Sequence, residues 1–499
     1  MYRIILLLAL SLICMEVSFA RTLTTEAEVA QGRIGTWPGS SAEECARAHF
    51  PKARFVYLDT VADMAQNLRQ KKIEAFAMNR IFVDELISAG QNDVEILGEP
   101  LGKTSFSFVF ADSGRGRKLC YEFNAFLAEC RANGKLAAWQ EKWFSGREEN
   151  RKVEEVVLHG ENGTLSVVTN PVLPPIIFMQ DNEISGFEAE LLRHFCAAYG
   201  YAYKITVATF ETGMAGVSTG QFDMGVCAVE YKPERAEHYL FSDKTCEADC
   251  VLAVRSEGDT GLGMAQVLKK KFADTFLRED RWKLFLSGLL TTMAITFFSV
   301  LIGTALGFGE CLLYQAKKRP LNAALEFLSK LFAGMPIVVL LMVFYYIVFG
   351  DWDISGTLVA IVAFSLLFGF SVFEMLKNAA ANIPRGQTEG ALALGFSEWQ
   401  TFLKFIIPQA IRQAFPVYQA EIVGLLKSTA VVGYIAVQDL TKMADIIRAQ
   451  NFDAFAPLVA ITVLYLAFVW LLQKITGAVL RGLDPKRRSR EEILRGIRP

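Results

Sequence analysis

Apolar and polar positions follow three different patterns along this chain. A short apolar run from Ile4 to Ile13 lies near the start, and five much longer apolar stretches lie between residues 284 and 480. Residues 21–280 instead alternate short β-rich runs with amphipathic stretches, which is typical of an α/β fold. The chain therefore has an α/β half followed by a hydrophobic, helical half.

The α/β half contains two series of alternating elements. The first predicts strands at 32–37, 54–58 and 73–79, and helices at 40–50 (with a serine at the N-cap), 60–72 and 119–144 (interrupted at Gly134). The second predicts a strand at 163–171, a helix at 186–200 and a strand at 203–209, then structured stretches at 213–229 and 231–243. Two α/β segments, 21–160 and 161–256, thus precede the hydrophobic half.

The first twenty residues resemble a secretory signal peptide. Arg3 precedes the apolar run, and the segment ends in Ser18-Phe19-Ala20, with small residues where a signal peptidase cleaves. The apolar run is shorter than the ~20 residues that span a bilayer; an uncleaved membrane anchor is the alternative. We expect residues 21–280 to be exported to an oxidising compartment.

Seven cysteines follow in the exported half. Their odd number and the lack of paired Cys-x-x-Cys motifs argue against a zinc site. Cys246 and Cys250 could close a small disulfide loop, or the thiols could be buried and unpaired. The seven are Cys45, Cys120, Cys130, Cys196, Cys227, Cys246 and Cys250.

Five apolar stretches are long enough to cross about 30 Å of hydrocarbon. Basic segments follow the first, third and fifth stretches, so the positive-inside rule puts the exported half outside and the C-terminus in the cytoplasm. Glu374 and Lys427 fall within these stretches, where charge is costly; we expect them to face a cavity or each other, unless Lys427 snorkels. The stretches lie near 286–313, 325–349, 355–380, 415–437 and 455–480.

Composition narrows the classes of function. The 499 residues are 52% hydrophobic, and 51 basic residues balance 53 acidic ones. This balance gives no basic field for nucleic acid, and four histidines leave few ligands for a His-rich metal site. The segment GEPLGKTS (98–105) is one residue too short for a phosphate loop, so we expect a turn there. We expect no enzyme activity, no metal and no cofactor.

The segment 385–416, RGQTEGALALGFSEWQTFLKFIIPQAIRQAFP, resembles the EAA loop of ABC importer permeases of the polar amino acid (histidine/glutamine) type. Stretches 287–307 and 425–440 resemble spans of the same family, so the resemblance covers 284–480. It implies a helix–turn–helix that docks on a cytoplasmic ATPase subunit, and a second permease subunit, identical or different. Gly395 is expected to end the first helix and Pro408 to limit the second. The coupling residues implied are Gly386, Gln387, Glu389, Ala391, Gly395 and Pro408.

The exported half resembles a type II periplasmic binding protein of the polar amino acid class. NGTLSVVTNPVLPPIIFM, ISGFEAELLRHFCAAYGY and GQFDMGVCAVEYKPERAEHYLFSD resemble that family's first lobe, and GRIGTWPGSSAEE and QNLRQKKIEAFAMN its second. The second-lobe segment comes first here. Circular permutation is one explanation, and two half-domains completed by another chain are the other.

This resemblance implies ligand-binding roles for three residues. Arg235, in a PER motif, is expected to grip a carboxylate in bidentate fashion, unless it pairs with Glu234 or Glu237. Ser40 and Ser41 stand at a helix start that favours an anion, although plain capping needs the same residues.

Three other binding positions depart from the family pattern. Leu173 stands where the family has an aromatic residue, Asn79 stands where it has the acid that meets the ligand ammonium, and the family has a small hydroxyl residue near Glu230. We therefore expect weak binding of common amino acids, or a preference for a less cationic carboxylate. Glu230 or Asp181 could move in and restore the missing charge.

Together these features predict an α/β bilobal binding-protein-like domain, a linker at 257–283, an all-α five-helix transmembrane domain at 284–482 and a basic tail at 483–499. The function implied is the fused solute-binding and membrane-spanning subunit of an ABC importer for amino acids or similar small polar solutes, in the bacterial inner membrane. The alternative is a ligand-gated channel or receptor with the same lobes. Here, however, both lobes precede every span, and no selectivity-filter sequence is present.

Overall fold

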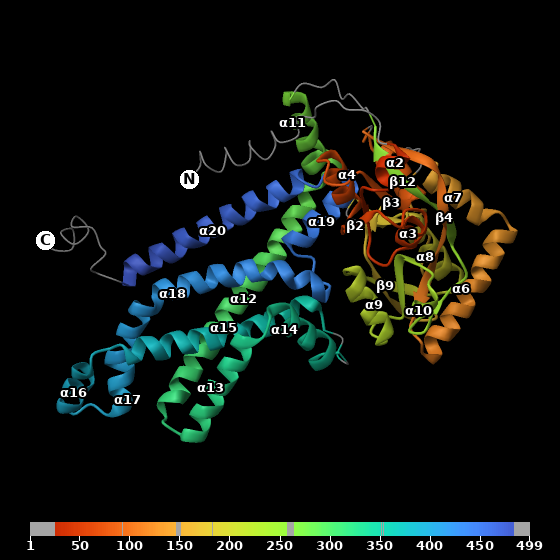
Figure 1. Cartoon of the computed structure of the whole chain (residues 1–499). Coiled ribbons are helices and arrows are strands. Elements are labelled where there is room, and N and C mark those ends of the chain that lie inside the picture. Colours follow the sequence, from red (N-terminus) through yellow and green to blue (C-terminus); the bar gives the residue numbers. More distant parts are fainter. Residues whose placement is uncertain are drawn as a thin grey trace. The chain divides into compact units, whose positions relative to one another are not determined.

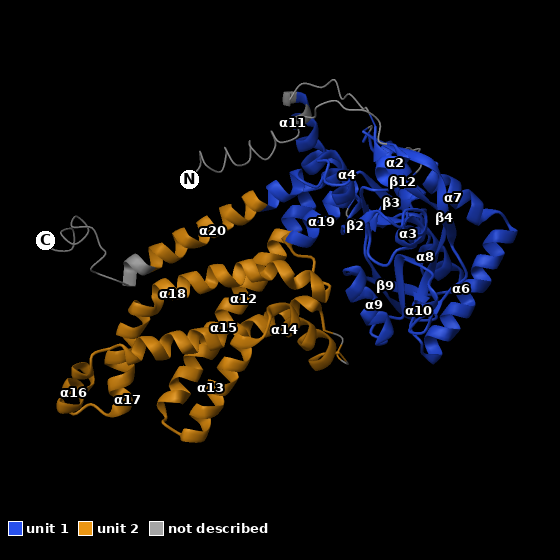
Figure 2. Ribbon diagram, viewed as in Figure 1, with its two compact units in different colours: residues 1–287, 441–461 blue, residues 288–440, 462–499 orange. Residues whose placement is uncertain are grey.

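The protein, seen in a computed structural model, divides into two compact units (Figures 1 and 2). Unit 1 comprises residues 1–287 and 441–461, and unit 2 comprises residues 288–440 and 462–499. The structure describes residues 25–483 except 92, 146–150, 182, 257–263, 351 and 353. The predicted signal peptide and the basic tail from residue 484 lie outside the described residues.

Unit 1 is built on a sheet of nine strands with the order β2-β1-β3-β12-β4-β10-β5-β9, in which β11 also pairs with β4. A separate three-stranded sheet has the order β6-β7-β8. The strands are β1 (Arg33–Thr36), β2 (Arg54–Tyr57), β3 (Ala75–Asn79), β4 (Val94–Phe110), β5 (Thr164–Thr169), β6 (Val172–Leu173), β7 (Ile177–Gln180), β8 (Glu183–Ser185), β9 (Ala202–Val207), β10 (Met224–Glu230), β11 (Leu240–Phe241) and β12 (Cys246–Arg255).

Two groups of parallel strands form two lobes within this sheet. Counted along the chain, the first lobe contains the parallel strands β1, β2 and β3, and the second contains β5, β9 and β10. The first lobe in this numbering is the one that resembles the second lobe of the binding-protein family, and the second resembles that family's first lobe. The long strands β4 and β12 run antiparallel and connect the lobes. Every residue of β3 and β10 is buried, as expected for strands covered on both faces. The predicted two-lobed α/β fold is confirmed.

Helices of unit 1 begin where the sequence supplies caps. Ser40, Thr60 and Ser113 cap α3, α4 and α6 through their side-chain oxygens. Gly134, with a φ of 78°, separates α6 from α7, because glycine adopts this conformation without a Cβ penalty. The helices are α2 (Glu26–Val29), α3 (Ser41–His49), α4 (Val61–Arg69), α5 (Arg80–Ser88), α6 (Gly114–Ala132), α7 (Lys135–Phe144), α8 (Phe187–Ala198), α9 (Phe210–Ser218), α10 (Pro233–Ala236), α11 (Met264–Phe272) and α19 (Leu440–Asn451).

Strands β4 and β12 contain residues 98–105, for which a turn was predicted, and the cysteine pair for which a disulfide loop was considered. Residues 98–105 are not a turn: they lie inside β4, where Lys103 and Thr104 pair with Asp249 and Ala248 of β12. Cys246 and Cys250 lie four positions apart on β12, roughly 13 Å in an extended strand, so they cannot form a disulfide with each other. All eight cysteines among the described residues are free thiols.

Unit 2 is helical. Within the described residues, three helices are long and apolar enough to cross a membrane: Trp282–Gln315, Gly356–Ala381 and Ala456–Val479. Two bent helix pairs, Arg319–Gly334 with Ile337–Val348 and Glu398–Ile435 with Leu440–Asn451, raise the number to as many as five. The helices are α12 (Trp282–Gln315), α13 (Arg319–Gly334), α14 (Ile337–Val343), α15 (Gly356–Ala381), α16 (Arg385–Ala393), α17 (Glu398–Thr401), α18 (Ile407–Ser428) and α20 (Ala456–Leu483).

The predicted span at 325–349 is not one straight helix. α13 and the following helix meet at an angle of 109°. Met335 at this break is extended, with a ψ of 133°, because the residue before a proline avoids the helical region, and Pro336 has no N–H to donate. The predicted span at 415–437 likewise begins earlier, in α18, and its last turns form a 3-10 helix over Thr429–Ile435.

Small residues bring α12 and α15 into close contact. A Cβ atom added to Gly303 would lie 2.7 Å from the Ser365 carbonyl oxygen, and one added to Gly307 would overlap the backbone at Gly369. Such small-residue crossings let membrane helices pack backbone against backbone. This crossing lies beside the unit 2 core, which includes Phe364, Phe368 and Phe373.

Candidate functional site

The carboxyl ends of three strands meet in the cleft between the lobes. Ser40 and Ser41 follow β1, Asn79 ends β3, and Glu230 ends β10. In open α/β sheets, ligands bind just beyond the carboxyl ends of the strands. Four of the residues predicted from sequence are therefore brought together in the place where this kind of fold has its binding site.

The Glu230 side chain joins the two lobes. Its Oε2 accepts hydrogen bonds from the Ser41 backbone N–H (2.7 Å) and the Ser41 hydroxyl (3.0 Å). Its Oε1 accepts one from Asn79 Nδ2 (2.9 Å). Glu230 is 7% exposed and Asn79 is 1% exposed, so these bonds are shielded from solvent. We call this set, Glu230 with Ser41 and Asn79, the Glu230 clasp.

The two serines have different roles. Ser40 is the N-cap of α3: its hydroxyl accepts from the Glu43 N–H (3.1 Å) and donates to the Trp37 carbonyl (3.0 Å). Ser41 instead faces Glu230, and its hydroxyl also accepts from Thr104 (3.1 Å). Plain capping therefore describes Ser40, whereas Ser41 points into the cleft.

Of the two other predicted binding residues, Arg235 contacts Glu230 and Leu173 lies in the core. Arg235, on α10, donates to the Glu230 carbonyl oxygen (3.2 Å) and lies over the Phe210 ring at 5.5 Å. Among the described residues it forms no ion pair with Glu234 or Glu237. Leu173 packs against the main core of unit 1, and no contact joins it to the Glu230 clasp in the described part of the chain.

A second contact ties the same two regions together. The Lys232 ammonium, just after β10, forms an ion pair with Glu44 of α3. Lys232 is 9% exposed, whereas the Glu44 side chain is 68% exposed. The Lys232–Glu44 ion pair therefore contributes only modestly to the stability of the contact between the lobes, as other ion pairs with an exposed partner do.

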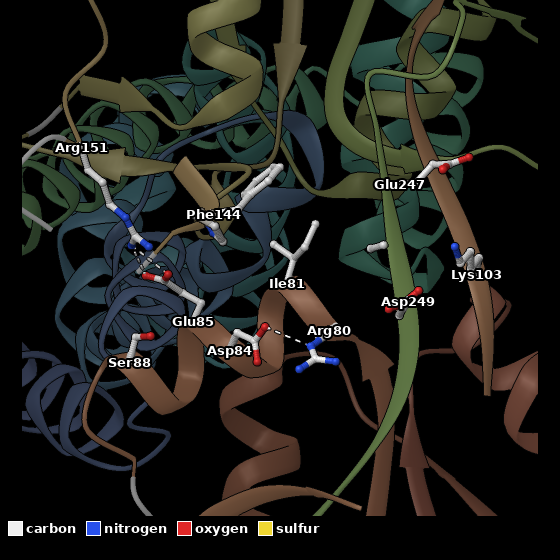
Figure 3. A pocket seen from close by; sticks show the side chains of 12 residues that line it. Arg80, Ile81, Asp84, Glu85, Ser88, Lys103, Phe144, Arg151, Glu247 and Asp249 are labelled. Atoms are coloured by element: carbon white, nitrogen blue, oxygen red, sulfur yellow. Dashed lines mark hydrogen bonds and ion pairs between the residues drawn. The ribbon is translucent and has the colours of Figure 1, made fainter. Parts of the chain in front are cut away.

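A polar cavity of about 360 Å³ lies beside the cleft (Figure 3). Figure 3 shows Arg80 and Asp84 of α5 on one side, and Lys103 of β4 with Asp249 of β12 on the other. Two ion pairs, Arg80–Asp84 (3.4 Å) and Arg151–Glu85 (2.7 Å), already neutralise much of its charge. Sequence analysis missed this cavity because its residues come from four separate elements and share no motif.

Glu188, at the start of α8, is completely buried. One oxygen accepts from the Ala228 N–H (2.9 Å), and the other has no hydrogen-bond partner among the described residues. Burial without a cation raises the pKa of Glu188 to about 8, and the Ala228 bond opposes this only partly. At neutral pH the native domain therefore holds this carboxyl group protonated.

One group of potential metal ligands is present among the described residues: Glu154, Glu190 and His194. The two oxygens of Glu190 already meet the Lys142 ammonium at 2.8 Å each, and one accepts from Trp143 Nε1. The Lys142 ammonium thus supplies to Glu190 the positive charge that a metal ion would supply. The group is accordingly an ion-pair network.

In unit 2, the predicted helix–turn–helix is present as α16, α17 and α18. Gly395, with a φ of 86°, follows α16; its N–H donates to Leu392, and the Phe396 N–H donates to Ala391, which is a Schellman ending. Gly395 thus ends the first helix as expected. Pro408 does not limit the second helix: it lies in the first turn of α18, where its missing N–H is tolerated.

The surface of this hairpin combines charge with exposed apolar side chains. Gly386, Gln387 and Glu389 are exposed, and Ala391 is 4% exposed. Leu392, Leu394 and Trp399 are exposed by 42%, 77% and 46%. Gln409 Nε2 donates to Gln387 Oε1 (3.3 Å), and Lys317 pairs with Glu398 (2.6 Å), so α18 and the α12–α13 connection hold the hairpin in place.

Helix α19, between α18 and α20, belongs to unit 1. Arg448 pairs with Asp63 of α4 (2.5 Å), in the first lobe. Lys442 donates to Asn170 Oδ1 (3.1 Å), and Gln450 donates to the Met179 carbonyl; both partners belong to the second lobe. A helix between two membrane stretches therefore contacts both lobes of the α/β domain.

The charged residues predicted within the spans do not face each other. Glu374 accepts from Lys377 (2.9 Å), one turn along α15, and from Ser329 of α13 (3.1 Å). Lys427 is exposed in the last turn of α18. Glu374 is instead satisfied within a small polar cluster between α13 and α15.

Comparison with known proteins assigns the hydrophobic half. The family model described as "Binding-protein-dependent transport system inner membrane component" matches residues 299–489. The arginine transport system permease protein ArtQ of Bacillus subtilis (strain 168) is 30% identical over 203 residues, 40% of this chain and 91% of ArtQ. The probable amino-acid ABC transporter permease protein YckA of the same organism is 28% identical over 214 residues, 43% of this chain and 93% of YckA.

Two solved structures add to this comparison. One, described as an amino acid ABC transporter with histidines, is 26% identical, covers 44% of this chain and 98% of its own, and has a TM-score of 0.38. The other, an ABC transporter periplasmic substrate-binding protein from Coxiella burnetii, is 10% identical, covers 48% of this chain and 90% of its own, and has a TM-score of 0.25. On the strength of its sequence relatives, the chain belongs to the family of binding-protein-dependent transport system inner membrane components.

Proposed function

We propose that this protein is the membrane-spanning subunit of an ABC importer and carries its own exported solute-binding domain. The observation that carries the proposal is the α16–α17 hairpin, which lies inside the matched region 299–489 and presents Glu389 with exposed Leu392 and Leu394. An exposed apolar hairpin with a charged rim fits a groove on another protein. Its partner is a cytoplasmic ATPase subunit, and a second permease subunit, identical or different, completes the pore.

The solute we propose is an amino acid or a similar small polar molecule. The relatives named above are described as transporting arginine or amino acids. In this chain, hydrogen-bond donors from Ser41 and Asn79 meet in the interlobe cleft, and Arg235 lies nearby with a side chain suited to a carboxylate. The lobes would close around the solute, as two-lobed binding domains do.

The orientation we propose puts the α/β domain outside the cytoplasm and the hairpin inside. The packing of α19 against both lobes supports this, because α19 and the α/β domain must then share one side of the membrane. α19 is also the element through which closing lobes would act on α18 and α20. Glu389 and the hairpin would carry the response to the ATPase.

ATP hydrolysis by the chain reconstituted with its ATPase tests this proposal. We expect amino acids to stimulate hydrolysis several-fold, and Glu389→Lys to abolish the stimulation while the protein still inserts and folds. Glu129→Lys, the same charge change on the exposed face of α6, is the matched control and should behave like the wild type. Full stimulation in Glu389→Lys would contradict the assignment of the hairpin.

A further inference from the structure

In the part of the chain that the structure describes, all donors to the Glu230 carboxylate come from the opposite lobe. Ser41 follows β1 and Asn79 ends β3 in the first lobe, whereas Glu230 ends β10 in the second. Both carboxylate oxygens are used, and the residue is 7% exposed. A buried carboxylate is stable only when donors replace its hydration, so separating the lobes here would require solvent to take their place.

The donors that surround Glu230 are those of a carboxylate site. The Ser41 N–H is the first of α3, a helix of nine residues, and has no acceptor within the helix. The helix start adds a positive partial charge. Asn79 turns its amide nitrogen toward Glu230, while its oxygen receives the Cys250 thiol (3.7 Å).

No cation of the described residues pairs with the Glu230 carboxylate. Among the described residues, Lys232 pairs with Glu44, and Arg235 donates to the Glu230 backbone oxygen rather than to its carboxylate. The site therefore relies on neutral donors and the helix start. Such a set accepts a carboxylate whatever molecule carries it, which makes Glu230 exchangeable for a carboxylate from solution.

We propose that Glu230 is a built-in carboxylate ligand: it closes the two lobes when the cleft holds no solute, and a solute carboxylate binds by displacing it from Ser41 and Asn79. This inference rests on the proposed function for the role of the cleft as a solute site. The clasp itself is a property of the exported domain and does not depend on transport.

Asn79 fits this arrangement. A carboxylate at position 79 would lie against the Glu230 carboxylate, and two like charges at that distance cannot both stay ionised at low cost. A neutral amide donates to Glu230 instead. The two departures from the resembled family, at 79 and at 230, thus compensate each other.

Hydrogen exchange of the Ser41 amide in the full chain, reconstituted in lipid nanodiscs, tests the clasp. Because the first N–H of a helix has no helical acceptor, only Glu230 protects it. In the wild type we expect slow exchange that acetate does not change. In Glu230→Ala we expect exchange at least tenfold faster, and millimolar acetate, but not chloride at equal ionic strength, should restore the protection.

Two further variants keep the test decisive. Glu237→Ala removes an exposed glutamate close by and should leave the Ser41 amide unchanged. If Glu230→Ala disturbs the whole domain, the same measurement is made on Glu230→Gln. For this variant we expect a partial loss of protection from hydrogen exchange at the Ser41 amide alone. Unchanged protection in Glu230→Gln, or deprotection in Glu230→Ala that acetate does not reverse, would overturn the proposal. Neither measurement involves the ATPase, so failure here is distinct from failure of the transport function.

Discussion

The Glu230 carboxylate lies 2.7 Å from the backbone nitrogen of Ser41, a residue 189 positions earlier in the chain. This contact places the end of β10 in one lobe against the start of α3 in the other. Two residues that are far apart in the sequence therefore form one hydrogen bond across the cleft.

A double substitution should convert this cleft to the pattern of the resembled family. Glu230→Ser removes the internal carboxylate and supplies a small hydroxyl, and Asn79→Asp supplies the acid for an ammonium group. Isothermal titration of the full chain against common L-amino acids should show binding at least tenfold tighter for the double variant than for the wild type. Asn79→Asp alone should bind poorly, because its carboxylate would face Glu230. Equal affinities in all three proteins would show that these positions do not contact the solute.

The stability of the α/β domain should fall as the pH rises, because of Glu188. Its pKa is raised to about 8 in the native domain, above about 4.3 in an unfolded chain. The native state therefore keeps a proton that the unfolded state loses, and stability is greatest at acid pH and decreases between about pH 4.3 and pH 8. The slope approaches ~1.4 kcal/mol per pH unit for one proton.

Hydrogen exchange of slow β10 amides at several pH values, corrected for intrinsic rates, measures this slope. Glu188→Gln keeps an acceptor for the Ala228 N–H but cannot ionise, so its slope should be shallower. A slope identical to that of the wild type would mean that Glu188 is already ionised in the native domain.

Crossing of α12 and α15 should depend on Gly307. A Cβ there would overlap backbone atoms at Gly369, whereas a Cβ on Gly309, on the same helix, would meet nothing within 4 Å. Gly307→Val should therefore lower the thermal midpoint of the membrane domain by several degrees or prevent folding, and Gly309→Val should not. Equal midpoints for the two variants in detergent would rule out this crossing.

The ion pair between Arg448 and Asp63 should connect solute binding to the membrane helices. Arg448→Ala should reduce solute-stimulated ATP hydrolysis several-fold and leave unstimulated hydrolysis and solute affinity unchanged. The charge exchange Arg448→Asp with Asp63→Arg should recover part of the stimulation. If Arg448→Ala stimulates like the wild type, α19 does not transmit lobe closure.

Features that depend on neighbouring residues were predictable from the sequence. Ser40 caps α3 and Gly395 ends α16, because capping requires a particular residue within one turn. The alternation of strands and helices likewise predicted an α/β fold, the resemblance to binding proteins predicted its two lobes, and the match of 385–416 predicted the family.

Features that depend on distant residues were not predictable. Asn79 and Glu230 were recognised one by one as departures, but their hydrogen bond depends on how β3 and β10 are aligned in the sheet. The cavity between Arg80 and Asp249 arises in the same way. Pro336 itself is a local signal for the bend. The sequence nevertheless predicted a single span at 325–349, because hydropathy measures how apolar a stretch is and not the direction of its backbone.

Uptake of labelled amino acids into proteoliposomes that contain the chain, its ATPase and internal ATP tests the central claim most directly, with the ATPase domains facing the lumen. We predict accumulation above the external concentration that stops when ATP is omitted or when Glu389→Lys replaces the wild type. Flux that is independent of ATP and only equalises the two concentrations would contradict an importer and favour a channel.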